Sequence, residues 1–242
     1  MKAEVTMPRK LELRRQQAIH VQKRTARPGP EIRMLRAALK TEFFFRRQLP
    51  AVFFHEPELP TGLPDLVAVY MSKKAPEVSP KRLRLKETHI RVLHGLHILS
   101  SISLHDLSPL LRIAPRELER LAIDLNDAEL VTFQGGILAP KRLSHSFAVK
   151  HIVAIEAKVG NWSKALEQAS ANRWFASQSF ILIPPSRSLA KIADRALELG
   201  VGVLVFEGNE VNQIIDSRVA PIPASYGSWL FNEWALRRGR SQ

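Results

Sequence analysis

The 242-residue chain contains no cysteine. This absence excludes disulfide bonds, thiolate zinc sites and cysteine nucleophiles, and it is typical of reducing compartments, so we expect a cytoplasmic protein. Long apolar runs are also missing. None approaches the roughly 20 residues that span a bilayer, and the basic N-terminus carries no apolar signal core. We therefore expect no membrane partner and no secretory leader.

Acidic residues are scarce relative to basic ones. The chain has 36 Lys and Arg against 23 Asp and Glu, which gives a net charge of +13. This excess favours a polyanionic partner, with nucleic acid as the first candidate. Residues 1–27 form a basic arm that either follows a phosphate backbone or is a solvated tail, and Arg237, Arg238 and Arg240 make the opposite end basic as well. Hydrophobic residues make up 45%, which is enough for a substantial core in one large or two modest domains.

Residues 151–160 (HIVAIEAKVG) predict a buried strand that ends in charge. Because side chains alternate along a strand, Glu156 and Lys158 must point from the same face. Burial of either charge alone would be costly, so we expect the two to meet each other, a metal ion or a phosphate. An amphipathic helix is predicted directly afterwards, over residues 162–177.

Two further patterns surround this strand. Upstream, residues 51–56 and 65–70 are short apolar runs separated by proline and glycine, which predicts a β-hairpin with Asp65 at the start of its second strand. Downstream, residues 179–184, 189–199 and 201–206 read as strand, helix and strand. Consecutive βαβ units favour right-handed crossovers onto one sheet. The chain is therefore expected to adopt an α/β fold.

The pair Pro64-Asp65 followed by Glu156-x-Lys158 resembles the motif of the PD-(D/E)XK nuclease superfamily. The resemblance implies a restriction-endonuclease-like mixed central sheet flanked by helices, formed by residues 28–72 and 148–242. It also implies that Asp65, Glu156 and the main-chain carbonyl of Ala157 hold Mg²⁺, for which Mn²⁺ would substitute. Lys158 would then orient or help to deprotonate the attacking water and stabilise negative charge on the phosphate.

The same resemblance implies auxiliary residues on two helices. Pro30 begins a predicted helix whose Glu31 would face the metal site, with Glu42 as the other candidate; a plain N-terminal helix carboxylate is the alternative for Glu31. Gln168, on the helix after Lys158, would assist at the site or else be solvated. Apart from the resemblance, the basic residue Arg173 on the same helix is expected either to contact a phosphate or to brace its helix.

Asp65 and Glu156 lie 91 positions apart, so something is inserted between their strands. Residues 82–145 predict three short helices and a hairpin: one helix follows a Ser103-x-x-Asp106 capping box, another starts at Pro115, and the hairpin turns at Gln134-Gly-Gly. This order resembles a winged helix-turn-helix domain, whose third helix enters the major groove.

In that interpretation, side chains of the third helix face DNA and side chains after the wing contact phosphates. Glu117 and Glu119 dilute the charge of the helix, so a role in protein contacts remains the alternative. The expected nucleic-acid-binding residues are Arg116, Arg120, Lys141 and Arg142.

The sequence thus predicts a Mg²⁺-dependent DNA endonuclease. Two alternatives remain open: a non-catalytic DNA-binding regulator on a nuclease-like fold, and an RNA-directed nuclease with the same site chemistry. Retention of Asp65, Glu156 and Lys158 together favours an enzyme. Many enzymes of this fold act as homodimers, although no coiled-coil pattern indicates one here.

Overall fold

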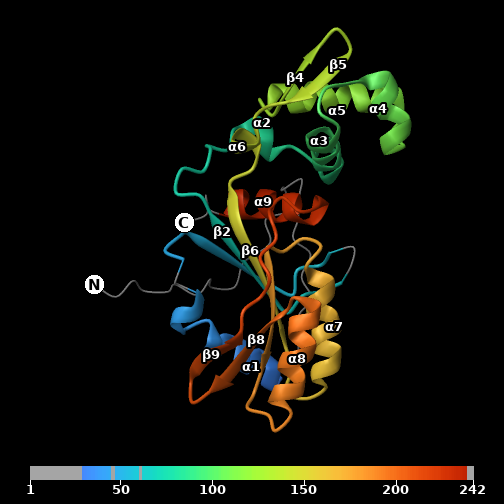
Figure 1. Cartoon of the computed structure of the whole chain (residues 1–242). Helices are drawn as coiled ribbons and strands as arrows, with labels where there is room; N and C mark the ends of the chain where they lie inside the picture. Colours follow the sequence, from blue (N-terminus) through green and yellow to red (C-terminus); the bar gives the residue numbers. More distant parts are fainter. Residues whose placement is uncertain (1–28, 45–46, 60–61, 239–242) are drawn as a thin grey trace.

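The computed structural model describes residues 29–44, 47–59 and 62–238. A central sheet with its helices forms the lower part of the molecule in Figure 1, and an insert forms the upper part. The predicted basic arm, residues 1–27, lies outside the described residues. No helix in the described part of the chain is long and apolar enough to cross a membrane.

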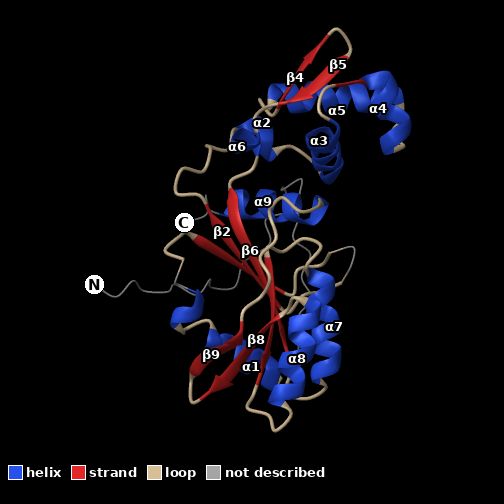
Figure 2. Ribbon diagram, viewed as in Figure 1, coloured by secondary structure: helices blue, strands red, loops and turns tan. Residues whose placement is uncertain are grey.

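The central sheet has six strands in the order β1-β2-β6-β7-β8-β9. β6, β7 and β8 pair in parallel, whereas the other three pairings are antiparallel. The predicted α/β fold with a mixed central sheet is therefore confirmed (Figure 2). The bounds are β1 (Ala51–His55), β2 (Leu66–Met71), β6 (Val149–Ala157), β7 (Gln178–Ile183), β8 (Gly202–Glu207) and β9 (Glu210–Ile215).

Helices cover both faces of this sheet because its buried strands are apolar on both sides. Along β2, Leu66, Ala68 and Tyr70 pack with α1, whereas Val67 and Val69 pack with α9. Alternate residues of β7 and β8 pack with α7 and α8. The helix bounds are α1 (Pro30–Ala38), the 3-10 helix η1 (Glu42–Phe44), α7 (Trp162–Asn172), α8 (Leu189–Leu199) and α9 (Tyr226–Arg238).

The insert contains helices and a small antiparallel sheet of order β3-β5-β4. Ser103 caps α4, because its hydroxyl accepts a hydrogen bond from the Asp106 N–H at 3.1 Å, as the capping box predicts. The turn between β4 and β5 uses Gly135 and Gly136 at φ of 57° and 75°, a conformation that favours glycine. The elements are α2 (Pro80–Leu83), α3 (Glu87–Leu99), β3 (Ile102–Ser103), α4 (Leu104–Leu111), α5 (Pro115–Asp127), β4 (Val131–Gln134), β5 (Ile137–Pro140) and α6 (Leu143–Ser146).

Both ends of the insert meet at one end of the sheet. β2 and β6 are hydrogen-bonded neighbours although the insert separates them in sequence. Just beyond the strands, the Ser72 N–H donates to the Ala148 carbonyl at 2.8 Å. The long sequence gap therefore leaves the two acidic strands adjacent in space.

α9 joins the insert to the sheet through buried charges. Glu233 is fully buried and forms an ion pair with Arg82, which is 2% exposed. Arg237 donates to the main-chain carbonyls of Arg82, Leu83 and Leu85 at 3.0, 2.8 and 3.3 Å. Arg237, which belongs to the basic terminus expected from the sequence, is thus buried and satisfies carbonyls of the insert.

Arg238 is likewise engaged by the fold. It donates to the Phe53 carbonyl at 2.9 Å, and its guanidinium lies 4.2 Å from the centre of the Phe54 ring. Arg240 lies outside the described residues. The charges at this end of the chain that the structure describes therefore serve packing.

Candidate active site

The strand register places two predicted metal ligands opposite each other. The registered β2–β6 pairs end with Leu66 opposite Ile155. Asp65 precedes Leu66 and Glu156 follows Ile155, so the two carboxylates come from facing positions on neighbouring strands. The Ala157 N–H donates to the Asp65 carboxylate at 2.8 Å, which fixes the side chain at the end of β6.

Lys158 meets two carboxylates at the same end of the sheet. Its Nζ lies 3.3 Å from Glu31 Oε2 and 3.8 Å from Asp65 Oδ2. Glu31 is in the first turn of α1, whereas Glu42 lies exposed in η1. Of the two predicted candidates, Glu31 is therefore the one at this site. The Lys158 side chain is 19% exposed, so the cluster opens to solvent.

Glu156 is the buried member of the site. It is 1% exposed, and its Oε1 accepts a hydrogen bond from Asn172 Nδ2 at 2.7 Å. Its Oε2 is buried without a hydrogen-bond donor among the described residues. Buried carboxylate oxygens are rarely left unsatisfied, so this atom is free to bind a cation or a proton.

α7 contributes one predicted and one unpredicted residue. Gln168 Oε1 is buried and, within the described chain, has no hydrogen-bond donor. Asn172 lies four residues later and hence on the same helix face. Asn172 was not predicted from the sequence, although its spacing from Gln168 carries that signal. The structure thus turns an amide-bearing face of α7 toward the buried carboxylate.

The two strand carboxyls have perturbed proton affinities. Burial, together with the neighbouring Asp65 carboxylate, raises the pKa of Glu156 to about 8, despite the hydrogen bond from Asn172. Burial also raises the pKa of Asp65, against the opposing effects of the Ala157 N–H and Lys158. In the absence of a cation the pair of carboxyl groups therefore holds a proton near neutral pH.

Lys158 is a charged ammonium in this site. Burial lowers the pKa of Lys158, but the Asp65 and Glu31 carboxylates outweigh burial, so the net shift is upward. A lysine with a raised pKa is a poor base at neutral pH. Of the two roles implied for Lys158, charge stabilisation is therefore favoured over deprotonation of water.

The shared proton predicts a specific dependence of stability on pH. Glu156 titrates near 4.5 when unfolded and near 8 when folded, so the folded state binds more protons between these values. The free energy of unfolding of metal-free protein should therefore fall as pH rises from about 4.5 to about 8. The measurement is urea unfolding in EDTA across this pH range. The Glu156→Gln variant should show a smaller decrease in the free energy of unfolding with pH than the parent protein, whereas Glu167→Gln, at an exposed position of α7, should show the parental decrease. Equal pH slopes in both variants would contradict the assignment.

The residues present fit a Mg²⁺ ion. The described residues contain no group of three or more His, Asp or Glu side chains arranged around one metal position. Mg²⁺ is commonly held by only one or two carboxylates, with waters completing its shell. Asp65, Glu156 and the Ala157 carbonyl supply that oxygen donor set, and the unpartnered Oε2 of Glu156 is the observation that supports it.

The expected nucleic-acid-binding residues fall into two groups. Arg116 and Arg120 are exposed on α5, and Arg142 is exposed after the β4–β5 hairpin with Lys141, half-buried, beside it. Arg173, in contrast, donates to the Leu199 carbonyl at 2.6 Å. The structure thus gives Arg173 the bracing contact between α7 and the end of α8.

Two acidic residues in the C-terminal half of α5 lie within ion-pair distance of basic residues of the same chain. Asp124 lies 3.0 Å from His89, and Asp127 lies 3.3 Å from Lys81. The exposed cations Arg116 and Arg120 lie in the other half of α5, and Arg112, just before the helix, is exposed as well. The N-terminal half of α5 therefore presents Arg116 and Arg120 to solvent together with the equally exposed Glu117 and Glu119, so its charge is mixed.

No protein-family model matches this chain, and no curated protein or solved structure is significantly similar to it.

Proposed function

We propose that the protein is a Mg²⁺-dependent DNA endonuclease of the PD-(D/E)XK type. The observation that carries the proposal is the convergence of Asp65, Glu156 and Lys158 at one end of the β2–β6 pair. The element order supports it: α1, an antiparallel β1-β2-β6 unit, then α7 and the parallel strand β7, which is the arrangement expected of a restriction-endonuclease-like core.

Each residue has a distinct part in phosphodiester hydrolysis. Asp65, Glu156 and the Ala157 carbonyl would hold Mg²⁺, which when bound supplies an acidified water and a counter-charge for the developing oxyanion. Lys158 offers its ammonium to the phosphate, and Glu31 holds that ammonium in place. Asn172 fixes the rotamer of Glu156 through its hydrogen bond to Oε1.

The insert supports DNA as the substrate. Its order of helix, short strand, two helices and hairpin is consistent with a winged helix-turn-helix domain, in which α5 would take the position of the third helix. Arg116 and Arg120 on α5 would face the major groove, and Lys141 and Arg142 would contact phosphates. The net charge of +13 agrees with a polyanionic partner.

The test is direct incubation of the purified protein with supercoiled, linear, single-stranded and branched DNA, and with RNA. Cleavage of a DNA form with Mg²⁺ or Mn²⁺, and none with EDTA, is the expected result. Cleavage of RNA alone would replace the DNA substrate with RNA. Tight DNA binding without cleavage under any condition would instead favour a DNA-binding regulator.

The role of the insert predicts two different responses to mutation. Removal of a side chain that binds a phosphate should lower the salt slope of log K by about 0.9. Removal of a side chain that binds a base should cost about 1–3 kcal/mol on the preferred sequence only. Lys141→Ala and Arg142→Ala should give the first response, and Arg116→Ala and Arg120→Ala the second.

Fluorescence anisotropy on two unrelated duplexes, across a salt series in EDTA, measures both responses. Arg195→Ala on α8 is the matched control, because Arg195 is an exposed arginine outside the insert. Unchanged affinity and slope in all four insert variants would mean that the insert does not touch DNA and serves protein contacts.

A further inference from the structure

The candidate active site and the insert lie at opposite ends of the same two strands. β2 and β6 are antiparallel, and Asp65 and Ala157 lie where β2 begins and β6 ends. The insert leaves the sheet at the other end, after Met71, and returns before Val149. Figure 1 shows the β4–β5 hairpin and α5 beyond α3 and α9, at the far end of the molecule.

The length of β6 sets a minimum distance between the candidate active site and the insert. A strand rises about 3.3 Å per residue, so the nine residues of β6 span about 26 Å. Duplex DNA advances 3.4 Å per base pair, so this length equals roughly 8 base pairs. α5 lies farther away still, because α3 is packed between it and α9. One short stretch of duplex therefore cannot contact α5 and the carboxylates together.

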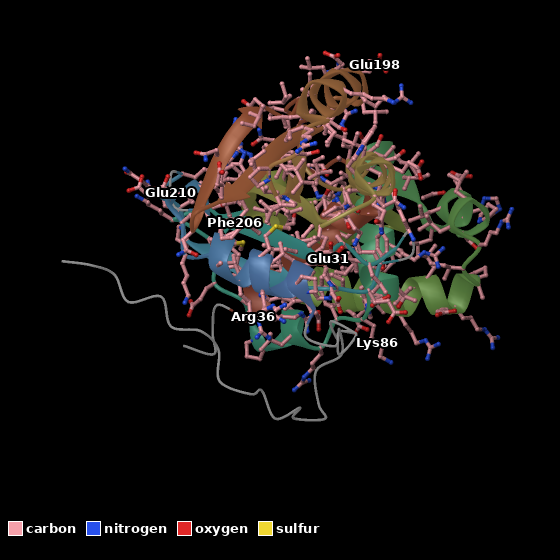
Figure 3. The ribbon with its side chains drawn as sticks, turned by 90° about the horizontal axis from the view of Figure 1, so that it is seen from below. Glu31, Arg36, Lys86, Glu198, Phe206 and Glu210 are labelled. Atoms are coloured by element: carbon pink, nitrogen blue, oxygen red, sulfur yellow. The ribbon has the colours of Figure 1, made fainter. Side chains whose placement is uncertain are left out.

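One side of the molecule carries exposed cations near both ends. Figure 3, viewed along the long axis, shows Glu31, Arg36 and Lys86 on the same side, opposite Glu198 of α8. Lys86 directly precedes α3 of the insert, and Arg36 is in the last turn of α1, the helix that supplies Glu31. Both cations are exposed. A duplex lying lengthwise along this side would meet the insert, both cations and the candidate active site.

We propose that the protein binds one duplex along this side and cuts it outside the segment read by the insert, displaced by at least about 8 base pairs, close to one helical turn. This inference rests on the proposed nuclease function and on DNA binding by the insert. Lys86 and Arg36 are phosphate contacts between recognition and cleavage. The rigid strand pair acts as the spacer, because the insert joins the sheet at its far end and is fixed there by α9.

The experiment compares a protected segment with a cut position on one end-labelled duplex of about 60 base pairs. Hydroxyl-radical footprinting uses Lys158→Ala protein, in which the cleavage residue is removed. A second footprint is taken with protein that carries Lys141→Ala and Arg142→Ala in addition to Lys158→Ala. The base pairs that lose protection between the two footprints define the insert-dependent segment. Cut positions are then mapped with the parent protein and Mg²⁺. The cut should fall at least about 8 base pairs from the edge of the insert-dependent segment.

Shortened duplexes and matched variants complete the test. Trimming the duplex to less than about 8 base pairs beyond the insert-dependent segment should abolish cleavage but preserve most of the binding. Lys86→Ala and Arg36→Ala should each lower the salt slope on the long duplex by about 0.9, whereas Arg195→Ala, on the side of Glu198, should not.

The possible failures are distinguishable. A cut inside the insert-dependent segment, or full cleavage of the trimmed duplex, would overturn the displacement while leaving the nuclease function intact. The insert and the candidate active site could also each protect a separate short duplex, with no need for one continuous duplex. That result would show that the protein binds two DNA arms, and it would also overturn the proposed displacement. Absence of any cleavage by the parent protein would overturn the nuclease function and, with it, this inference.

Discussion

Replacement of Lys158 by alanine is expected to lower the rate of DNA cleavage by about 10²–10³-fold, the usual cost of losing one charge-stabilising group at a reacting centre. The ammonium lies 3.3 Å from Glu31 and 3.8 Å from Asp65, so it is positioned beside the carboxylates that would hold the metal. The raised pKa of Lys158 keeps it charged at neutral pH. The measurement is kcat/KM on a DNA form that the parent protein cuts.

Three controls separate catalysis from folding and binding. Lys164→Ala removes an exposed lysine from α7 and should leave the rate unchanged. DNA affinity in EDTA should change little in Lys158→Ala, because the remaining basic surface is intact. If Asp65, Glu156 and Lys158 act as one catalytic unit, Asp65→Asn and Glu156→Gln should lower kcat/KM by about as much as Lys158→Ala does. A Lys158→Ala protein that cuts at the parental rate would remove this site from consideration.

Replacement of Glu233 by alanine is expected to reduce the free energy of unfolding by about 3–5 kcal/mol, because one partner of a buried ion pair is left uncompensated. Glu233 is 0% exposed and pairs with Arg82, while Arg237 lies 4.0 Å away. Urea unfolding followed by tryptophan fluorescence measures the decrease. The four tryptophans of the chain include Trp229 and Trp234 on α9 itself, so the signal reports this region.

The chain offers a matched exposed pair for comparison. Arg195 and Glu198 form an ion pair on the surface of α8, with side chains 57% and 62% exposed. Glu198→Ala should cost at most about 1 kcal/mol, since exposed pairs are screened by solvent. Equal decreases in Glu233→Ala and Glu198→Ala would show that the buried pair does not hold the insert to the sheet.

Local periodicity explains which parts of the site were predictable. The period of two along β6 places Glu156 and Lys158 on one face, and Pro30 marks the start of the helix that brings Glu31 to Lys158. The facing position of Asp65 also follows once β2 and β6 pair. Local repeats set the direction of each side chain, but the contacts of Lys158 with Glu31 and Asp65 join distant segments. The expectation that these residues meet comes from the resemblance to the PD-(D/E)XK motif.

Contacts between distant segments were not predictable in the same way. The spacing of Asn172 from Gln168 places both residues on one face of α7, but its pairing with Glu156 is set by the packing of α7 on the sheet. Arg237 reads as part of a basic end, yet its partners are carbonyls more than 150 positions earlier in the chain. A single sequence carries no direct signal for such pairs, because burial of a charged residue is decided by which surfaces pack together.

The position of α9 has a consequence for how the chain matures. Phe231 and Trp234 pack with β1 and β2 residues, whereas Trp229 packs against His97 and Phe147, so one helix completes two hydrophobic surfaces. During synthesis the sheet strands and the insert both leave the ribosome before α9 does. Their apolar faces stay open to chaperones, proteases and neighbouring chains until residue 236 has emerged. Premature termination in this helix would expose both surfaces at once.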